Sequence, residues 1–184
     1  MPPTFPEALK SAEERLTHAL SMPVRVVLHR HLSPELSEAI ATIDRAMFRT
    51  ELRYTIEEIS ESATKEDYIA ITAETDAVIA VSYGYAGEDG YFLDTLATTV
   101  ERKGIGSTLA TLLILYAAER GYPQITLYTE KTDEKGRRLR EWYKRALGFT
   151  YKSTIPRKGD VMVLDLTPEA VEGLYARHVA TTSS

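Results

Sequence analysis

The hydrophobic pattern of the chain changes its period near residue 68, and this change limits the possible folds more than any other feature. Before that point apolar residues recur mainly at helical spacing, as Leu36, Ile40, Ile43 and Met47 do. Runs of β-branched and aromatic residues follow at 68–72, 77–83 and 91–97, separated by turn-forming residues at 74–76 and 88–90. Helix-like and strand-like segments then alternate. Antiparallel strands followed by strand–helix–strand units predict an α/β fold of the α+β type with a mixed sheet.

The other segments complete this order. Further strands are predicted over 24–28, 125–129, 149–154 and 161–166, giving a central sheet of about seven strands. Helices that flank the sheet are predicted over 6–20, 34–48, 107–120, 135–147 and 168–178, with a shorter one after Thr55. Ser33, Thr55 and Thr167 have the character of N-caps. We expect one domain over 1–184, with a core of about 24–166 and helical extensions at 1–20 and 168–184.

The composition excludes several kinds of chemistry. The chain has no cysteine, which rules out disulfides, thiolate metal sites and a cysteine nucleophile, and we expect no bound metal. No apolar run approaches the roughly 20 residues that span a bilayer, and residues 1–20 carry prolines and charges where a signal peptide would be apolar. The sequence therefore favours a cytoplasmic protein that does not bind membranes.

The net charge of -5 hides an uneven distribution. Residues 1–100 carry 8 basic and 17 acidic side chains, whereas residues 101–160 carry 13 basic and 7 acidic ones. A basic segment in an acidic chain indicates a polyanionic partner at that segment; a solvated basic helix is the alternative. Nucleic acid is not favoured, because neither zinc-ligand spacing nor an aromatic and basic RNA-binding motif accompanies the charge.

The most informative stretch runs from Glu101 to Leu109, where a strand ends and a helix begins. Its Gly104-Ile105-Gly106 turn lets the backbone approach a ligand, and the first N–H groups of the helix are available to hold a pyrophosphate. The Walker pattern is absent, and Leu109 stands where a dinucleotide fingerprint would have its third glycine. A tight structural turn is the alternative interpretation.

Residues 68–166 resemble the GNAT (Gcn5-related N-acetyltransferase) family. The resemblance lies in Leu93-Asp94-Thr95-Leu96-Ala97-Thr98, in Gly104-Ile105-Gly106 with the following helix and strand, and in Trp142-Tyr143-Lys144-Arg145-Ala146-Leu147-Gly148-Phe149. It implies an acetyl-CoA-dependent N-acetyltransferase of a small molecule or peptide amine. The backbone of Leu96, Ala97 and Thr98 would bind the pantetheine arm. The amides that would hold the pyrophosphate belong to Arg102, Lys103, Gly104, Ile105, Gly106, Ser107 and Thr108.

The same resemblance implies that Tyr143 protonates the departing thiolate of CoA. A phenol, with a reference pKa of about 10, remains a proton donor at neutral pH. The alternative is that Tyr143 belongs to the apolar face of its helix and only packs. Asp94 is the first candidate for the general base, followed by Glu51 and Glu58. The acidic first half favours a cationic acceptor, and relatives in the family suggest a homodimer.

Three departures from the family pattern affect this interpretation. Glu101 stands where the family motif begins with Gln or Arg, and a carboxylate there disfavours a pyrophosphate unless it points away. Tyr143 lies five residues before Gly148, one more than is common, so the helix end must absorb a residue or Tyr143 is rotated. Gly136, Arg137 and Arg138 occupy the region of a frequent asparagine. A non-catalytic CoA-binding regulatory or protein-interaction module therefore remains the alternative function.

Overall fold

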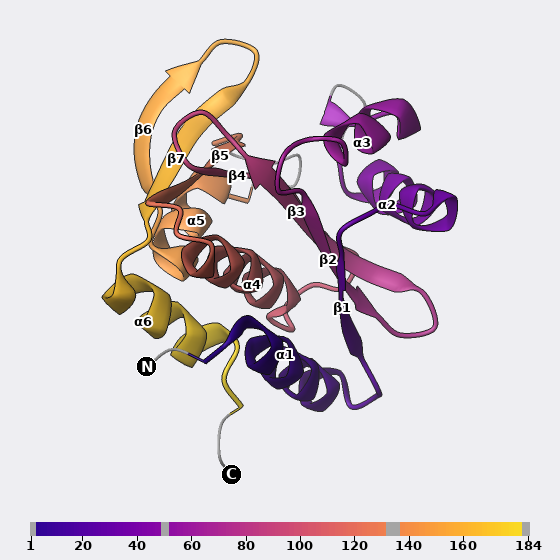
Figure 1. Ribbon diagram of the computed structural model, residues 1–184. Coiled ribbons are helices and arrows are strands. Elements are labelled where there is room, and N and C mark those ends of the chain that lie inside the picture. Colours follow the sequence, from indigo (N-terminus) through magenta and orange to yellow (C-terminus); the bar gives the residue numbers. More distant parts are fainter. Residues whose placement is uncertain (1–2, 49–51, 132–136, 182–184) are drawn as a thin grey trace.

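The computed structural model describes residues 3–48, 52–131 and 137–181, and its centre is a mixed β-sheet (Figure 1). The strands lie in the order β1-β2-β3-β4-β5-β7-β6. Neighbours are antiparallel except for β4 and β5, which are parallel. The predicted mixed sheet of seven strands is thus confirmed. The strand bounds are β1 Arg25–His29, β2 Ile69–Glu74, β3 Val78–Ala86, β4 Tyr91–Thr98, β5 Gln124–Thr129, β6 Thr150–Ile155 and β7 Gly159–Asp165.

Helices cover both faces of the sheet (Figure 1). On one face lie α1 (Phe5–Leu20), α4 (Ile105–Glu119), α5 (Leu139–Leu147) and α6 (Pro168–His178), whose apolar residues share one core. On the other face, α2 (Pro34–Met47) and α3 (Ile56–Ser62) pack over β2, β3 and β4 with a second core. The order of helices and strands along the chain is the order that the sequence predicts.

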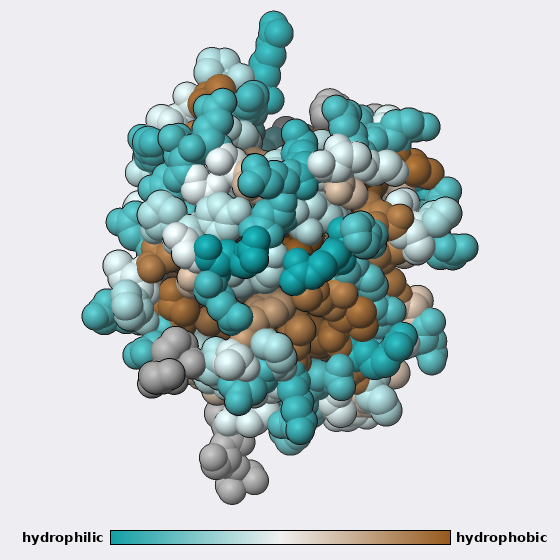
Figure 2. Space-filling model, in the orientation of Figure 1, coloured by the Kyte–Doolittle hydropathy of each residue, from teal (hydrophilic) through white to brown (hydrophobic). Residues whose placement is uncertain are grey.

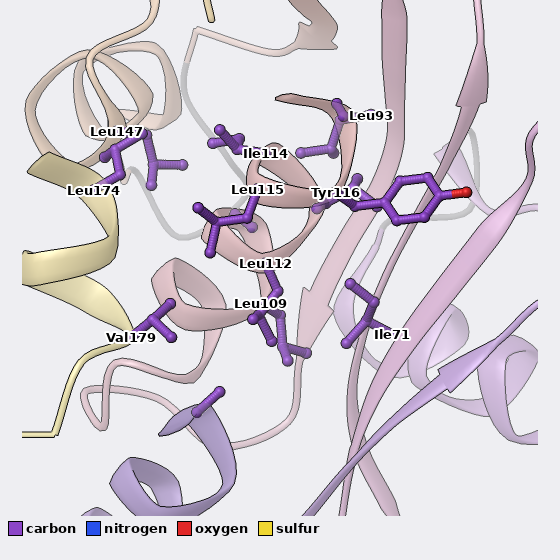
Figure 3. Close-up of a cluster of buried hydrophobic side chains, with 14 of the residues drawn as sticks. Ile71, Leu93, Leu109, Leu112, Ile114, Leu115, Tyr116, Leu147, Leu174 and Val179 are labelled. Atoms are coloured by element: carbon purple, nitrogen blue, oxygen red, sulfur yellow. The ribbon is translucent and has the colours of Figure 1, made fainter. Parts of the chain in front are cut away.

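Helix α4 is the centre of the larger core. Its sequence is apolar on all sides, which is typical of a helix without a solvent face, and every residue from Thr108 to Ala117 is buried. Figure 3 shows why: Leu174 of α6, Val179 just after α6 and Leu147 of α5 pack on one side of the helix, and Ile71 and Leu93 of the sheet lie on another. The predicted C-terminal extension therefore covers α4.

The three predicted N-caps are present together with a fourth, Thr4, whereas α4 and α5 begin without a side-chain cap. The side chains of Thr4, Ser33, Thr55 and Thr167 each accept a backbone N–H at the start of α1, α2, α3 and α6. Thr55 and Glu58 form the predicted capping box. Helix α4 has Gly104 at its N-cap and no side-chain cap. The first backbone N–H groups of α4 are therefore not bound by a capping side chain.

Two predicted helix starts are wrong. Helix α4 begins at Ile105, before the predicted residue 107, because Gly104 adopts φ 75° and ends the turn earlier. Helix α5 begins at Leu139 rather than at 135; positions 135 and 136 lie outside the described residues. Arg138 is extended, with φ -83° and ψ 90°, and Arg137 instead reaches the carboxylate of Glu101. The side chain of Arg137 thus connects the start of α5 to the loop that precedes α4.

The surface seen in Figure 2 is largely hydrophilic, with apolar side chains gathered near the middle of the face, around the region that α4 and the neighbouring strands occupy in Figure 1. Within the ranges that the structure describes, none of the helices combines the length and apolar character needed to cross a membrane.

Candidate active site

The sheet opens into a cleft where β4 and β5 separate. These parallel strands pair only at Tyr91 with Ile125 and at Phe92 with Thr126. Beyond that point β4 stays paired with β3, through to Thr98, and β5 pairs with β7. The edge of β4 that faces β5 is therefore open from Leu93 onward. A cleft of about 800 Å³ occupies this region.

A β-bulge in β4 directs Asp94 into the cleft. Tyr83 of β3 pairs with Thr95, and the next residue, Gly84, pairs with Leu93, so Asp94 is the extra residue. Leu93 accordingly packs in the core around α4, whereas Ala97 packs under α2 and α3. A Cβ on Gly84 would lie 2.3 Å from the carbonyl oxygen of Phe92. The bulge therefore needs glycine at position 84.

One end of the cleft is acidic and aromatic. The hydroxyl of Tyr85 donates to Asp94 Oδ2 at 2.5 Å, and Thr95 Oγ1 donates to Asp94 Oδ1 at 3.0 Å. Asp44 of α2 is buried and accepts the backbone N–H of Tyr54 at 2.7 Å. Burial raises the pKa of Asp44, and the charges of Asp94 and Glu58 add to that effect, although the Tyr54 N–H and Arg53 oppose it. Three carboxylates from three elements therefore converge on this end.

The other end of the cleft is formed by the loop before α4 and the first turn of that helix. Arg102 and Gly104 both adopt positive φ, 63° and 75°, which turns the loop sharply into α4. The first helical bond runs from Thr108 N–H to Gly104 O, at 3.0 Å. The N–H groups of Ile105, Gly106 and Ser107 precede it and have no acceptor within the helix. This arrangement fits a diphosphate.

The structure brings together most residues that the sequence assigned to acetyl-CoA. The cleft is lined by Leu96, Ala97, Thr98, Arg102, Gly104, Ile105, Gly106 and Ser107. Lys103 is exposed in the loop and does not line the cleft. Thr108 does not line it either: its amide is bound within the helix and its hydroxyl donates to the carbonyl oxygen of His178 at 2.7 Å. Two of the assigned positions therefore lie beside the cleft.

Tyr143 lines the cleft from α5. Its ring lies edge-on to the rings of Trp142 and Phe149, at centroid distances of 4.9 and 5.9 Å. Burial raises the pKa of Tyr143 to about 12, so its hydroxyl keeps its proton throughout the neutral range. The N–H groups of Gly148 and Phe149 both reach the carbonyl oxygen of Tyr143. This widened last turn accommodates the additional residue between Tyr143 and Gly148.

The carboxylate of Glu101 forms an ion pair with Arg137. Glu101 Oε1 accepts a hydrogen bond from Arg137 at 2.9 Å, and both residues line the cleft. Arg137 thereby offsets the negative charge that the sequence places next to the expected pyrophosphate. Both side chains are partly exposed, so water screens the pair.

Several residues of the cleft were not expected from the sequence, namely Asp44, Tyr54, Tyr85, Arg157 and Lys158. Asp44 had a signal, because it interrupts the apolar face of α2 next to Ile40 and Ile43. Gly84 within a strand was also a signal for a bulge. The candidate base Glu58 lines the cleft as well as capping α3, whereas Glu51 lies outside the described residues. Across 3–48, 52–131 and 137–181, no group of three acidic or histidine side chains could hold a metal ion.

Comparison with known proteins identifies the fold. No protein-family model and no curated protein matches the chain. Among solved structures, an aminoglycoside 6′-acetyltransferase of type Ii matches with a TM-score of 0.65 and 23% identity, over 80% of this chain and 99% of that one. The ribosomal-protein-S18-alanine N-acetyltransferase of Escherichia coli matches with a TM-score of 0.60 and 15% identity, over 77% of this chain and 94% of that one. The PaiA N-acetyltransferase of Thermoplasma acidophilum, in complex with coenzyme A, matches with a TM-score of 0.60 and 18% identity, over 76% of this chain and 98% of that one.

These neighbours share the mixed sheet and its covering helices with the chain, at less than 25% identity. The chain therefore has the GNAT acetyltransferase fold, as its motifs indicated. Structures with coenzyme A bound are among the neighbours. Their acceptors, by name, range from an aminoglycoside to the alanine of a ribosomal protein, so the fold leaves the acceptor of this chain open.

Proposed function

We propose that the chain is an acetyl-CoA-dependent N-acetyltransferase that acts on an amine by direct attack on the thioester. The observation that carries this proposal is the separation of β4 from β5 beyond Phe92, which opens a cleft toward the uncapped first turn of α4. Acetyl-CoA supplies the acetyl thioester. We further propose that residues 1–184 act as one catalytic domain and that no metal takes part.

The α4 end of the cleft and the open edge of β4 suit the two parts of this substrate. The amides of Ile105, Gly106 and Ser107 would hold the pyrophosphate, and Arg102 would add a positive charge at the rim. The open edge of β4, at Leu96, Ala97 and Thr98, would pair with the amide groups of the pantetheine arm as a neighbouring strand does. The N–H groups of the same edge are also the donors that can stabilise an oxyanion at the reacting carbonyl.

Asp94 and Tyr143 would handle the two protons of the reaction. Asp94 would accept the proton of the attacking amine, since the β-bulge directs its carboxylate into the cleft. Tyr143 would donate its hydroxyl proton to the sulfur as the carbon–sulfur bond breaks. Its raised pKa, about 12, keeps the donor protonated at neutral pH.

The first experiment is a calorimetric titration of the purified protein with acetyl-CoA. We expect saturable binding that Gly106→Leu weakens strongly, because a Cβ at Gly106 meets only Thr98 Cγ2 at 4.0 Å and a larger side chain would extend into the cleft without disturbing the fold. Gly173→Leu is the matched control, since Gly173 is also helical with no atom within 4 Å of its Cβ position. No binding at millimolar acetyl-CoA would refute the proposal.

Turnover is measured next, as release of free CoA thiol in the presence of a panel of amines. Tyr143→Phe keeps the ring contacts with Trp142 and Phe149 and removes only the hydroxyl. We expect it to bind acetyl-CoA normally and to lower kcat by about a hundredfold, the usual scale of general acid catalysis. An unchanged kcat would leave Tyr143 a packing residue. CoA binding without turnover on any amine would favour the non-catalytic alternative.

A further inference from the structure

The acceptor end of the cleft is built from carboxylates that belong to separate parts of the fold. Asp44 comes from α2, Glu58 from α3 and Asp94 from the bulge of β4, and all three line the cleft. Figure 1 shows α2 and α3 side by side over the same face of the sheet. Only one of these carboxylates, Asp94, has a part in the proposed proton transfer.

Tyr54 connects the three carboxylates. Its backbone N–H donates to Asp44 Oδ2 at 2.7 Å, and the next residue, Thr55, forms the capping box with Glu58. Burial raises the pKa of Tyr54 above its usual value, and the charge of Asp94, followed by those of Asp44 and Glu58, raises it further. The ring of Tyr54 thus lies within the field of all three charges, on the wall of the cleft.

Aromatic rings extend this acidic surface along the cleft. Tyr85, which donates to Asp94, lies 5.6 Å from Phe92, and Phe92 lies 5.0 Å from Tyr128, measured between ring centroids. Ammonium groups of the protein already lie over two of these rings: Lys65 Nζ is 5.1 Å from the centroid of Tyr85 and Lys158 Nζ is 5.7 Å from that of Tyr128. Aromatic faces beside carboxylates are a typical environment for alkylammonium groups.

A buried phenol, that of Tyr83, lies in the electrostatic field of Asp94 without lining the cleft. Tyr83 is 0% exposed, and its hydroxyl has no hydrogen-bond partner among the described residues. Burial raises the pKa of Tyr83, and the nearby charge of Asp94 is the next cause. The carboxylate of Asp94 thus accepts a hydrogen bond from one phenol, Tyr85, and its charge acts on a second, Tyr83. A cation at this end would lower the electrostatic energy of the converging carboxylates.

From this arrangement we infer that the acceptor is an amine that carries a second positive charge. Asp94 would hold the amine that is acetylated. Asp44 and Glu58 would hold the second ammonium group, together with the aromatic wall, the rings of Tyr85, Phe92 and Tyr128. The inference rests on the proposed function and names the substrate class of the same cleft. Lys158 at the tip of the β6–β7 hairpin would compete with the second charge, because it lies over the same aromatic wall.

Three probes of equal chain length test the inference: 1,4-diaminobutane, n-butylamine and 4-aminobutanoate, each with saturating acetyl-CoA. They share one primary amine and differ in the charge at the far end. We expect KM to rise in that order, and the difference between the first two probes to shrink as salt is added. A lower KM for 4-aminobutanoate than for 1,4-diaminobutane would overturn the inference while leaving the acetyltransferase function in place.

The variant Glu58→Gln separates the charge of Glu58 from its structural part, because glutamine at this position preserves a capping box. We expect it to raise KM for 1,4-diaminobutane by about threefold to tenfold, and less for n-butylamine. Glu57→Gln is the matched control: Glu57 is an exposed neighbour in the same helix turn that does not line the cleft. Lys158→Gln should lower KM for 1,4-diaminobutane; an increase instead would contradict the inference.

Binding of 1,4-diaminobutane, measured by calorimetry with and without CoA, keeps the test independent of turnover. Binding that Glu58→Gln weakens would support the cation site even in a chain that fails to bind CoA, where the proposed function itself would be refuted. No binding and no acetylation of 1,4-diaminobutane, in a protein that binds CoA, would refute the cation site alone.

Discussion

The hydroxyl of Thr108 donates a 2.7 Å hydrogen bond to the carbonyl oxygen of His178. The imidazole of the same histidine lies, through Nε2, 2.7 Å from the carbonyl oxygen of Ala146. Thr108 belongs to the first turn of α4 and Ala146 to the last turn of α5, so the end of α6 links the two helices. One of these helices provides the candidate anion site and the other carries Tyr143.

Replacing Thr108 by valine tests this link. The side chain keeps its shape, but the partly buried carbonyl of His178 loses its donor, which costs about 1 kcal/mol of unfolding free energy. Urea unfolding followed by circular dichroism measures the change. Thr99→Val is the control, because the Thr99 hydroxyl is exposed and its acceptor, the carbonyl of Ile79, also receives the N–H of Thr99. Equal losses for the two variants would show that the link contributes nothing specific.

The imidazole of His178 predicts a dependence of stability on pH. Burial lowers the pKa of His178 in the folded chain, and the charges of Arg177 and Arg15 act in the same direction, although its bond to Ala146 opposes them. Below the unfolded pKa of about 6.5 the unfolded chain binds the additional proton, so stability falls as the pH is lowered through that value and below. His178→Gln should unfold with a shallower pH dependence between pH 7 and 5.

The measurement is the midpoint of thermal unfolding at several pH values. His31→Gln serves as the comparison, because His31 is exposed, and it should keep the slope of the unmodified chain. If His178→Gln keeps that slope as well, the imidazole titrates alike in the folded and unfolded states, and the prediction is wrong.

The sequence predicts the elements well where local signals and the apolar pattern agree. The segment Leu109–Leu115, apolar except for Thr111, is typical of a covered helix, and Gly148 ends α5 as expected, with φ 80°. The start of α5 was misplaced because Arg137 and Arg138 are good helix formers. Arg137 instead contacts Glu101, 36 residues earlier, which no local pattern encodes.

The candidate site likewise has one part that local sequence signals predict and one part that depends on contacts between distant segments. The part proposed to bind acetyl-CoA lies mostly within one continuous segment, from Leu96 to Ser107, and was therefore predictable from a motif. The acceptor end combines Asp44, Tyr54, Tyr85 and Asp94 from distant segments. Their meeting depends on the register of β3 and β4 and on the packing of α2 over that pair, which a single sequence does not specify. An acidic residue inside the apolar face of α2 was the available hint.

Gly84 should be among the least replaceable residues outside the cleft. A Cβ there would lie 2.3 Å from Phe92 O and 2.9 Å from Tyr91 Cε1, so Gly84→Ala must move the strand that carries Asp94. We expect a loss of about 3 kcal/mol in unfolding free energy and a reduced kcat. Gly87→Ala, in the turn that follows β3, meets atoms at 3.4 Å and should change stability by less than about 0.5 kcal/mol. Similar losses for both variants would mean that the bulge tolerates a side chain.

The charge of Glu101 should weaken the binding of acetyl-CoA, because it adds a carboxylate to the end of the cleft that is proposed to hold phosphates. Glu101→Gln can still accept a hydrogen bond from Arg137 through its amide oxygen. We expect the Kd for acetyl-CoA to fall by about threefold in 50 mM salt and the gain to shrink in 500 mM salt, as screening requires. Glu88→Gln, in the exposed turn before β4, should change neither value. Weaker binding by Glu101→Gln would mean instead that its ion pair with Arg137 positions the loop for the ligand.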